Sequence, residues 1–335
     1  MGWRGRGGGA LTCAGSGARV ALAIMTPRPD GTPEWAPERE ITPETVARLL
    51  DEAFPDLRGA PVERLAAGWD NTVFLVDGAW AFRFPRREIA VPGVEREIAA
   101  LPVLAPRLPL PVPVPHYVGR PSAVFPWPFW GGRMIAGREL AEVRPPDARR
   151  VRVAAETGAF LRALHDPALA EEAGPHLPND PLGRADVAKR ASMALERLRN
   201  LAAQGLWRTD AAVTGLLAEA GRGDAAGGVP VVCHGDLHVR HLLLRPDGRA
   251  AGVIDWGDVC LADPGVDLSL AYAGFTGDAR AVFLAEYGPV PARSERVART
   301  LAVFLSATLA EYAAATGRDG LLTEALAGIG RALDP

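Results

Sequence analysis

The sequence is poor in cysteine and has no excess of positive charge. Only three of its 335 residues are cysteines, Cys13, Cys233 and Cys260, and they form neither a CxxC pair nor an even-numbered framework. We therefore expect reduced thiols and a cytoplasmic protein. The formal net charge of −3 gives no electrostatic basis for binding nucleic acid. No unbroken apolar run approaches the ~18 residues of a membrane span, so we expect no membrane partner.

The length suits two domains or one bilobal domain, and a hydrophobic content of 48% is that of a soluble globular protein. We expect residues 1–40 to be a disordered leader, because 1–24 are rich in glycine and arginine without periodicity and 26–40 are rich in proline. A signal peptide is the alternative for 1–24, but Gly15, Gly17 and Arg19 would interrupt its apolar core. A true start at Met25 is a further interpretation.

The most informative stretch runs from Val231 to Asp267. A short apolar run leads into a polar cluster, and a second apolar run ends at Asp255. Carboxylates and imidazoles beside short buried strands are costly unless they perform chemistry or hold a metal. The cluster contains His234, Asp236, His238 and His241.

The spacing within this stretch favours phosphoryl transfer. Asp236 and His241 are five positions apart, and Asp255 follows fourteen positions later. A phosphoryl-transfer site needs one carboxylate to accept the proton of a substrate hydroxyl, and ligands for the magnesium ions that bridge the nucleotide phosphates. A metal hydrolase using His234, Asp236 and His238 is an alternative, because an HxDxH triplet can hold a metal, but it leaves Asp255 unused. A turn aspartate beside a structural histidine is the simplest interpretation of HxD alone.

The segments HGDLHVRH and GVIDWGD resemble the aminoglycoside phosphotransferase family, which has the protein-kinase-like fold. The resemblance implies an α+β, bilobal architecture: a small β-rich lobe at 41–133, a hinge at 134–137 and a larger, mostly helical lobe at 138–335. Asp236 matches the catalytic base of the family and Asp255 its metal-binding aspartate.

Other positions of the stretch are assigned through the same resemblance. The family usually has asparagine where this chain has His241, and macrolide phosphotransferases are similar to it in having histidine there; His241 is the second candidate metal ligand. Imidazole is softer than the oxygen ligands that magnesium prefers. Asp267 matches the family's DPxxDL segment, and it and His234 are expected to support the catalytic loop.

The small lobe should bind the nucleotide. A turn from Gly68 to Asn71 between two strand-like runs lies where a kinase covers the phosphates, and Gly68 and Asn71 are candidate contacts. Arg83 alternates with Phe82 and Phe84, which directs it toward the cleft, where the kinase template has lysine. We expect a helix at 92–101 to supply its carboxylate partner.

That partner is Glu97 by the family's spacing, with Glu95 as a rival. At the hinge, the backbone N–H and C=O groups of Met134 and Ile135 should hydrogen-bond to the base of the nucleotide. The aromatic residues at 127–130 could form a stacking surface, although such a stretch is more often core.

The predicted activity is Mg²⁺-dependent phosphorylation of a small-molecule hydroxyl by ATP or GTP, the acceptor being antibiotic-like. Residues 278–335 carry seven acidic residues against six arginines. This absence of an acidic bias favours a macrolide-like or neutral acceptor over a polycationic aminoglycoside. A metabolic kinase for choline, homoserine or a sugar-like compound is an alternative. So is a non-catalytic nucleotide-binding module, in which Arg83 and His241 mark decay. The oligomeric state is not predicted.

Overall fold

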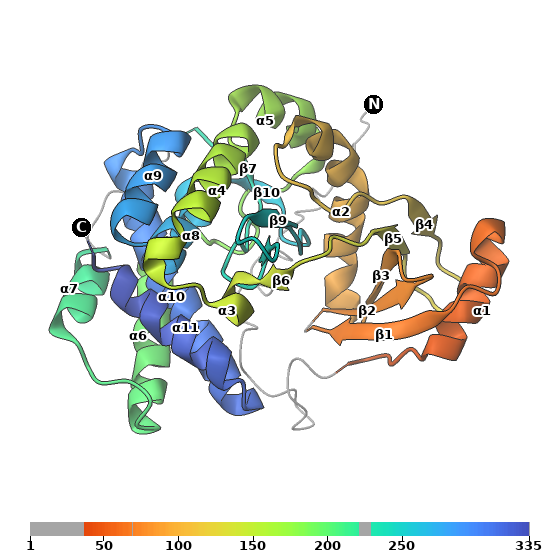
Figure 1. The fold of residues 1–335 in the computed structure, drawn as a ribbon, viewed down its shortest axis with the longest axis horizontal. Helices are drawn as coiled ribbons and strands as arrows, with labels where there is room; N and C mark the ends of the chain where they lie inside the picture. The colour runs from red at the N-terminus through yellow and green to blue at the C-terminus, as the bar shows by residue number, and fades with distance from the viewer. Residues whose placement is uncertain (1–36, 69, 221–228, 335) are drawn as a thin grey trace, which may run out of the picture. The chain divides into compact units, whose positions relative to one another are not determined.

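The computed structural model describes residues 37–68, 70–220 and 229–334 (Figure 1). Most of the expected leader, residues 1–36, lies outside the described residues, as does Cys13. Cys233 and Cys260 are buried free thiols. All the elements given below belong to the unit that begins at Pro37.

The small lobe is a five-stranded antiparallel sheet in the order β1-β2-β3-β5-β4. Helix α1 packs against β1, and α2 contacts β5 and connects β3 to β4 (Figure 1). The elements are α1 (Pro43–Ala53), β1 (Val62–Ala67), β2 (Asn71–Val76), β3 (Trp80–Pro85), α2 (Val91–Leu104), β4 (Tyr117–Gly119) and β5 (Phe129–Arg133).

Local chemistry explains two of these boundaries. The hydroxyl of Thr42 accepts the N–H of Thr45 at 3.3 Å, and Pro43 occupies the first position of α1, where its missing N–H costs nothing. Asp77 and Gly78 have φ of 51° and 61°, as a tight two-residue hairpin between β2 and β3 requires. The apolar residues of alternate positions in β2 and β3 then face α1 and form one core.

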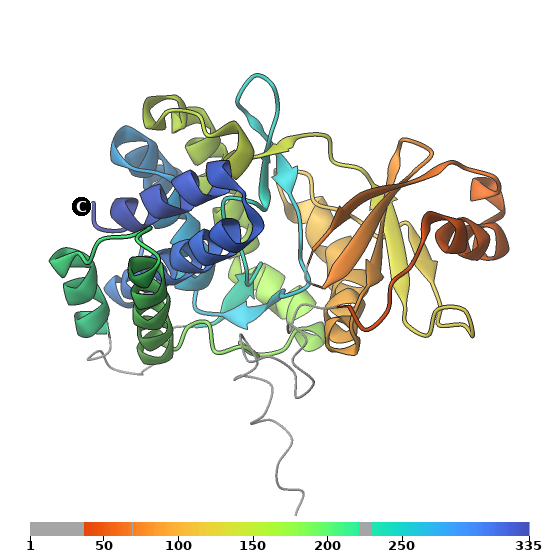
Figure 2. The same cartoon turned by 90° about the horizontal axis from the view of Figure 1, so that it is seen from below.

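The large lobe begins after the short connection that follows β5. Strand β6 (Arg138–Glu139) pairs with β8 (Leu242–Leu244), which pairs with β9 (Ala250–Val253), and β7 (Val231–Cys233) pairs with β10 (Cys260–Ala262). The helices pack around these strands (Figures 1 and 2). They are α3 (Leu140–Val143), α4 (Val151–Leu164), α5 (Pro167–Ala173), α6 (Val187–Ala203), α7 (Ala211–Ala220), α8 (Gly265–Gly274), α9 (Gly277–Tyr287), α10 (Ala292–Thr316) and α11 (Asp319–Arg331).

Helix α10 is the most apolar long helix of the described residues. It is long and apolar enough to cross a membrane by length and composition, with a window of mean hydropathy 1.2. Arg299 and Glu311 interrupt its apolar residues, so the helix contains no long unbroken apolar run. In the fold, 72% of that window is buried, and the helix packs against α6, α8 and α11 (Figure 2). This degree of burial is that of a core helix.

Candidate active site

The loop that follows β7 is fixed by one buried carboxylate and one neutral imidazole. Asp267, in the first turn of α8, accepts the backbone N–H groups of His234 at 2.6 Å and Gly235 at 3.0 Å. His234 Nε2 donates to the carbonyl of Ile254 at 3.0 Å, and its Nδ1 accepts the N–H of Asp236 at 3.2 Å. Burial lowers the pKa of His234, which keeps the ring neutral. Both residues therefore hold the loop that presents Asp236.

Backbone conformation at two positions also defines this loop and its neighbour. Gly235 has φ of +88°, and a Cβ there would overlap the carbonyl oxygen of Asp258. Asp255 has φ of +71°, a left-handed conformation that is uncommon for a residue other than glycine. Such conformations persist where the surroundings enforce them, and they concentrate at functional sites.

His241 brings Asp236 and Asp255 together. Its Nδ1 lies 2.8 Å from the carbonyl oxygen of Asp236, and its Nε2 lies 3.2 Å from Oδ2 of Asp255. Because a carbonyl only accepts, Nδ1 carries a proton. Nε2 donates to the Asp255 carboxylate when the ring is protonated, and in the neutral ring its lone pair is free to bind a cation next to that carboxylate. An imidazole whose other nitrogen donates to a carbonyl is a common metal ligand, so this pair fits a divalent cation.

The imidazole of His241 and the carboxylate of Asp255 each stabilise the charged form of the other. Burial alone would lower the pKa of His241, but the carboxylate of Asp255 raises it. The loss of surrounding water in the site would raise the pKa of Asp255, but Arg83 and His241 hold it well below its usual range. Asp255 is therefore ionised, and its side chain is 47% exposed, which leaves it open to a ligand.

Arg83 on β3 joins Asp255 to a fully buried carboxylate. Its Nη1 lies 3.0 Å from Oε1 of Glu97 on α2, and its Nη2 donates to Asp255 Oδ1. Glu97 also accepts the indole N–H of Trp130 at 3.1 Å and the backbone N–H of Trp256 at 3.0 Å. Burial would lower the pKa of Arg83, but the two carboxylates more than offset this and raise it. The guanidinium thus spans from α2 to the end of β9.

The structure distinguishes Glu97 from Glu95 as the partner of Arg83, and a core role from a stacking role for two of the aromatic residues at 127–130. Glu95 is exposed on α2, so Glu97 is the residue that pairs with Arg83. Phe129 and Trp130 are buried, Phe129 within the core against α1, so this part of the suggested stacking surface is core. The hydrogen bond from the Trp130 indole to Glu97 was not predicted from the sequence.

The sheet face beside Arg83 is apolar and incompletely covered. Val73 lies opposite Arg83 across the β2–β3 pair, and Leu75 lies opposite Ala81. Val73, Leu75 and Ala81 are half-buried, whereas alternate residues of β2 on the opposite face are fully buried against α1. A flat ligand could therefore cover this face next to the guanidinium.

The predicted nucleotide loop and hinge are only partly open to a ligand. Gly68 N–H donates to the carbonyl of Asn71 at 2.9 Å and closes the turn. Met134 N–H donates to the carbonyl of Ala79 at 2.9 Å, so that donor is not available to a nucleotide base. The backbone groups of Ile135 have no hydrogen-bond partner among the described residues.

Arg184, in the loop before α6, is a site residue that could not be found from the sequence. Its Nη1 lies 2.8 Å from Oδ1 of Asp236, and its Nη2 donates to Oδ2 of Asp258. Nothing in the local sequence marks it, since it follows a turn rather than a recognisable motif.

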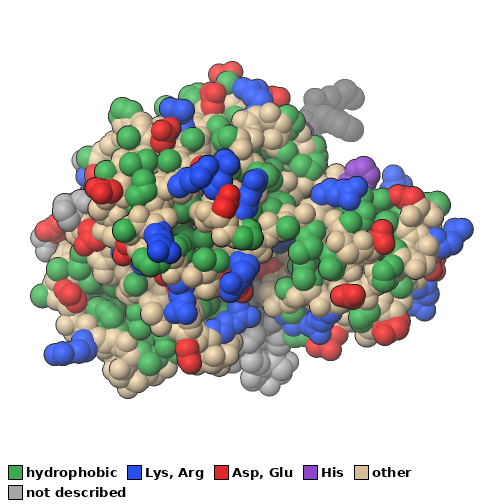
Figure 3. All heavy atoms as spheres, in the orientation of Figure 1, with side chains coloured by type: hydrophobic (Ala, Val, Ile, Leu, Met, Phe, Trp, Pro, Cys, Tyr) green, Lys and Arg blue, Asp and Glu red, His purple; other side chains and the backbone are tan. Residues whose placement is uncertain are grey.

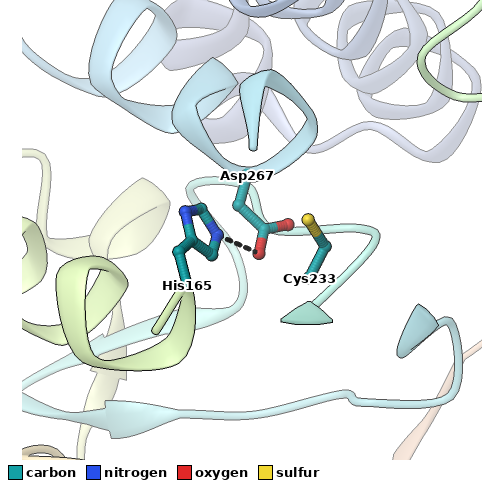
Figure 4. A group of neighbouring side chains, drawn as sticks. All are labelled: His165, Cys233 and Asp267. Carbon is teal, nitrogen blue, oxygen red and sulfur yellow. Dashed lines mark hydrogen bonds and ion pairs between the residues drawn. The ribbon is translucent and has the colours of Figure 1, made fainter. Parts of the chain in front are cut away.

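Two groups of potential metal ligands do not form the sites that their residue types suggest. His234 has both ring nitrogens occupied, so the HxDxH metal-hydrolase triplet does not converge on one ion. In Figure 4, His165, Cys233 and Asp267 lie together in the interior. Both oxygens of Asp267 already accept backbone N–H groups, and burial raises the pKa of the Cys233 thiol well above its usual value. We interpret this cluster as structural.

Comparison with known proteins identifies the family and the fold of this chain. The model of the phosphotransferase enzyme family matches residues 61–304. The uncharacterized protein YcbJ of Bacillus subtilis (strain 168) is 38% identical over 60 residues, which are 18% of this chain and only 19% of that protein's length.

Two solved structures are similar in fold. APH(2″)-IIIa in complex with GDP and kanamycin has a TM-score of 0.63 at 22% identity, covering 86% of this chain and 97% of that one. A macrolide 2′-phosphotransferase type I has a TM-score of 0.56 at 23% identity, covering 85% and 96%. These likenesses confirm the bilobal protein-kinase-like fold. With the family match over most of its length, the chain belongs to the phosphotransferase enzyme family.

Proposed function

We propose that this protein transfers the terminal phosphoryl group of ATP or GTP to a hydroxyl group of a small molecule, with Asp236 as the base. The observation that carries the proposal is the position of His241. Its two ring nitrogens contact the carbonyl of Asp236 and the carboxylate of Asp255, residues nineteen positions apart in the chain. The His241 ring also lies within 4.8 Å of the Asp236 carboxylate and 3.2 Å from the Asp255 carboxylate, so a carboxylate for the hydroxyl proton and a carboxylate for a metal lie on either side of one imidazole.

The nucleotide would bind beside Arg83. The half-buried face formed by Val73, Leu75 and Ala81 offers an apolar surface for a base, and Ile135 offers backbone groups without a partner among the described residues. The turn from Gly68 to Asn71 would lie over the phosphates. GDP in the solved structure of APH(2″)-IIIa supports a nucleotide donor.

Asp255 and His241 would hold Mg²⁺. A bound magnesium ion neutralises charge on the phosphates that it bridges. Carboxylate oxygen suits this hard cation, and the imidazole contributes a softer ligand oriented by its bond to the Asp236 carbonyl.

The acceptor would be a neutral hydroxylated compound. Three glutamates in β6, α3 and α4 are each paired with an arginine, in the ion pairs Arg240–Glu139, Arg138–Glu142 and Arg249–Glu156. Acidic and basic side chains are interspersed on the face shown in Figure 3. A polycation needs carboxylates that are not already neutralised, so this arrangement favours a macrolide-like acceptor over an aminoglycoside.

The test is the substitution Asp236→Asn, which keeps the shape of the side chain but removes the base. Wild type and variant would be assayed for nucleoside diphosphate release with ATP and with GTP, over a panel of macrolides, aminoglycosides and small metabolic alcohols. We expect kcat to fall by about 10²–10⁴-fold while the nucleotide still binds. Asp247→Asn, in the exposed β8–β9 turn, is the matched control and should retain activity.

Two outcomes would count against the proposal. Full activity of Asp236→Asn would exclude its role as base, and phosphorylation of aminoglycosides alone would refute the neutral acceptor. Chelation of divalent cations should abolish transfer, and added Mg²⁺ should restore it.

A further inference from the structure

We infer that Arg184 is a positioning residue that fixes the position of Asp236 relative to the loop that follows Asp255. The inference rests on the proposed function, because it concerns the base of that reaction. Arg184 binds one carboxylate from each loop: Asp236 from the loop after β7, and Asp258 from the loop after β9.

The geometry of this contact is that of a clamp. The side chain of Arg184 is 12% exposed, and its two terminal nitrogens point to different carboxylates. A planar guanidinium presents its donors in a fixed fork, so it sets the separation of two acceptors in a way that a single ammonium cannot. Burial would lower the pKa of Arg184, but Asp236 and Asp258 raise it, so the clamp stays charged.

The backbone at Arg184 is held in place by hydrogen bonds of its own. The Asp180 carboxylate accepts the backbone N–H of Arg184 at 2.7 Å and that of Ala185 at 2.9 Å. The same segment is joined to β10, since Leu261 N–H donates to the carbonyl of Pro178 at 2.9 Å and Asp180 N–H donates to the carbonyl of Leu261 at 2.9 Å. Because β10 pairs with β7, the clamp and the loop of Asp236 share one support.

The contact also selects which oxygen of Asp236 is left for the acceptor. Arg184 binds Oδ1, whereas Oδ2 lies 3.7 Å from Nε2 of His238, beyond hydrogen-bond distance. Oδ2 is therefore the oxygen that a substrate hydroxyl can reach. Without the clamp the carboxylate can rotate, and a reacting group misplaced by about 1 Å can cost on the order of 100-fold in rate.

The test compares Arg184→Met with a matched buried arginine whose carboxylate partner belongs to neither loop of the site. Arg197 on α6 pairs with Glu311 on α10 at 2.5 Å, with side chains 6% and 10% exposed. We expect Arg184→Met to lower kcat by on the order of 100-fold with little change in the KM of the nucleotide. Arg184→Lys should recover part of this loss, and Arg197→Met should lower stability but leave kcat near wild type.

A double variant separates positioning from a general loss of structure. If Arg184 acts by joining the two loops, Asp258→Asn should lower kcat less than Arg184→Met does, and the pair should be no worse than Arg184→Met alone. Wild-type kcat in folded Arg184→Met, or additive losses in the double variant, would overturn the inference. Either result leaves the proposed function intact, because that depends on active wild type and inactive Asp236→Asn.

Discussion

Replacing Arg83 by methionine should destabilise the protein more at alkaline than at acidic pH. Arg83 neutralises Glu97, which is fully buried and also accepts hydrogen bonds from Trp130 and Trp256. Burial raises the pKa of Glu97 to about 7 from an ordinary value of 4.5, even with Arg83 in place. Without the guanidinium, the pKa of Glu97 must lie higher still.

The sign of the effect follows from proton linkage. A raised folded-state pKa means that the carboxyl's contribution to stability is complete below pH 4.5 and is lost as the pH rises to about 7, after which it is constant. In Arg83→Met the loss continues above pH 7, by about 1.4 kcal/mol per pH unit. The difference in free energy of unfolding between wild type and variant should therefore widen as the pH rises above about 7, until the pKa of Glu97 in the variant is passed.

Urea unfolding of wild type and Arg83→Met at several pH values measures this difference. The same pair in a Glu97→Gln background is the control, because glutamine cannot ionise while the contribution of the Asp255–His241 pair is common to both backgrounds. The widening should disappear when position 97 carries no titratable carboxyl. A difference that is constant with pH, or one that widens equally in the glutamine background, would refute the role assigned to Glu97.

Three further predictions concern other parts of the site and fold. Gly235→Ala should lower the free energy of unfolding by more than Gly248→Ala does. Both have positive φ, but only at Gly235 would the new Cβ meet backbone; equal losses in urea would contradict the close approach. Glu324→Gln should cost about 1–3 kcal/mol, because it removes the buried carboxylate that Arg150 and Arg331 share and leaves the more exposed Asp147 as their acidic partner; calorimetry showing no loss would disprove this. His241→Asn should retain Mg²⁺-dependent activity, whereas His241→Leu should weaken Mg²⁺ binding about 10–100-fold in a titration of kcat; an unchanged titration for leucine would exclude His241 as a ligand.

The parts of the site that could be predicted from sequence are those fixed by short-range order. Alternation along β3 directs Arg83 away from the α1 core, and the spacing of Asp236, His241 and Asp255 is set by one loop and one hairpin. These relations need only strand period and turn chemistry, which the sequence displays directly.

The rest depends on segments that meet only in the folded chain. Arg184 lies 52 positions before Asp236, and its placement requires the turn at Asp180 to pack on β10. The partner of Trp130 is likewise on another element. At the hinge, the N–H of Met134 is used by the sheet, because the β3–β5 pairing continues one residue further than the strand pattern indicates.

The arginine at position 83 has a consequence for nucleotide binding. Lysine, which the kinase template has here, offers a single ammonium nitrogen, whereas the guanidinium of Arg83 contacts Glu97 and Asp255 through two separate nitrogens. Glu97 is immobilised by burial and two further hydrogen bonds, but Asp255 is 47% exposed. When phosphates and a metal compete for Arg83 and Asp255, the contact between Arg83 and Asp255 breaks more easily than the contact between Arg83 and Glu97. We therefore expect Arg83 to keep its contact with α2 while Asp255 turns from the guanidinium toward the cation, freeing Nη2 for a phosphate oxygen.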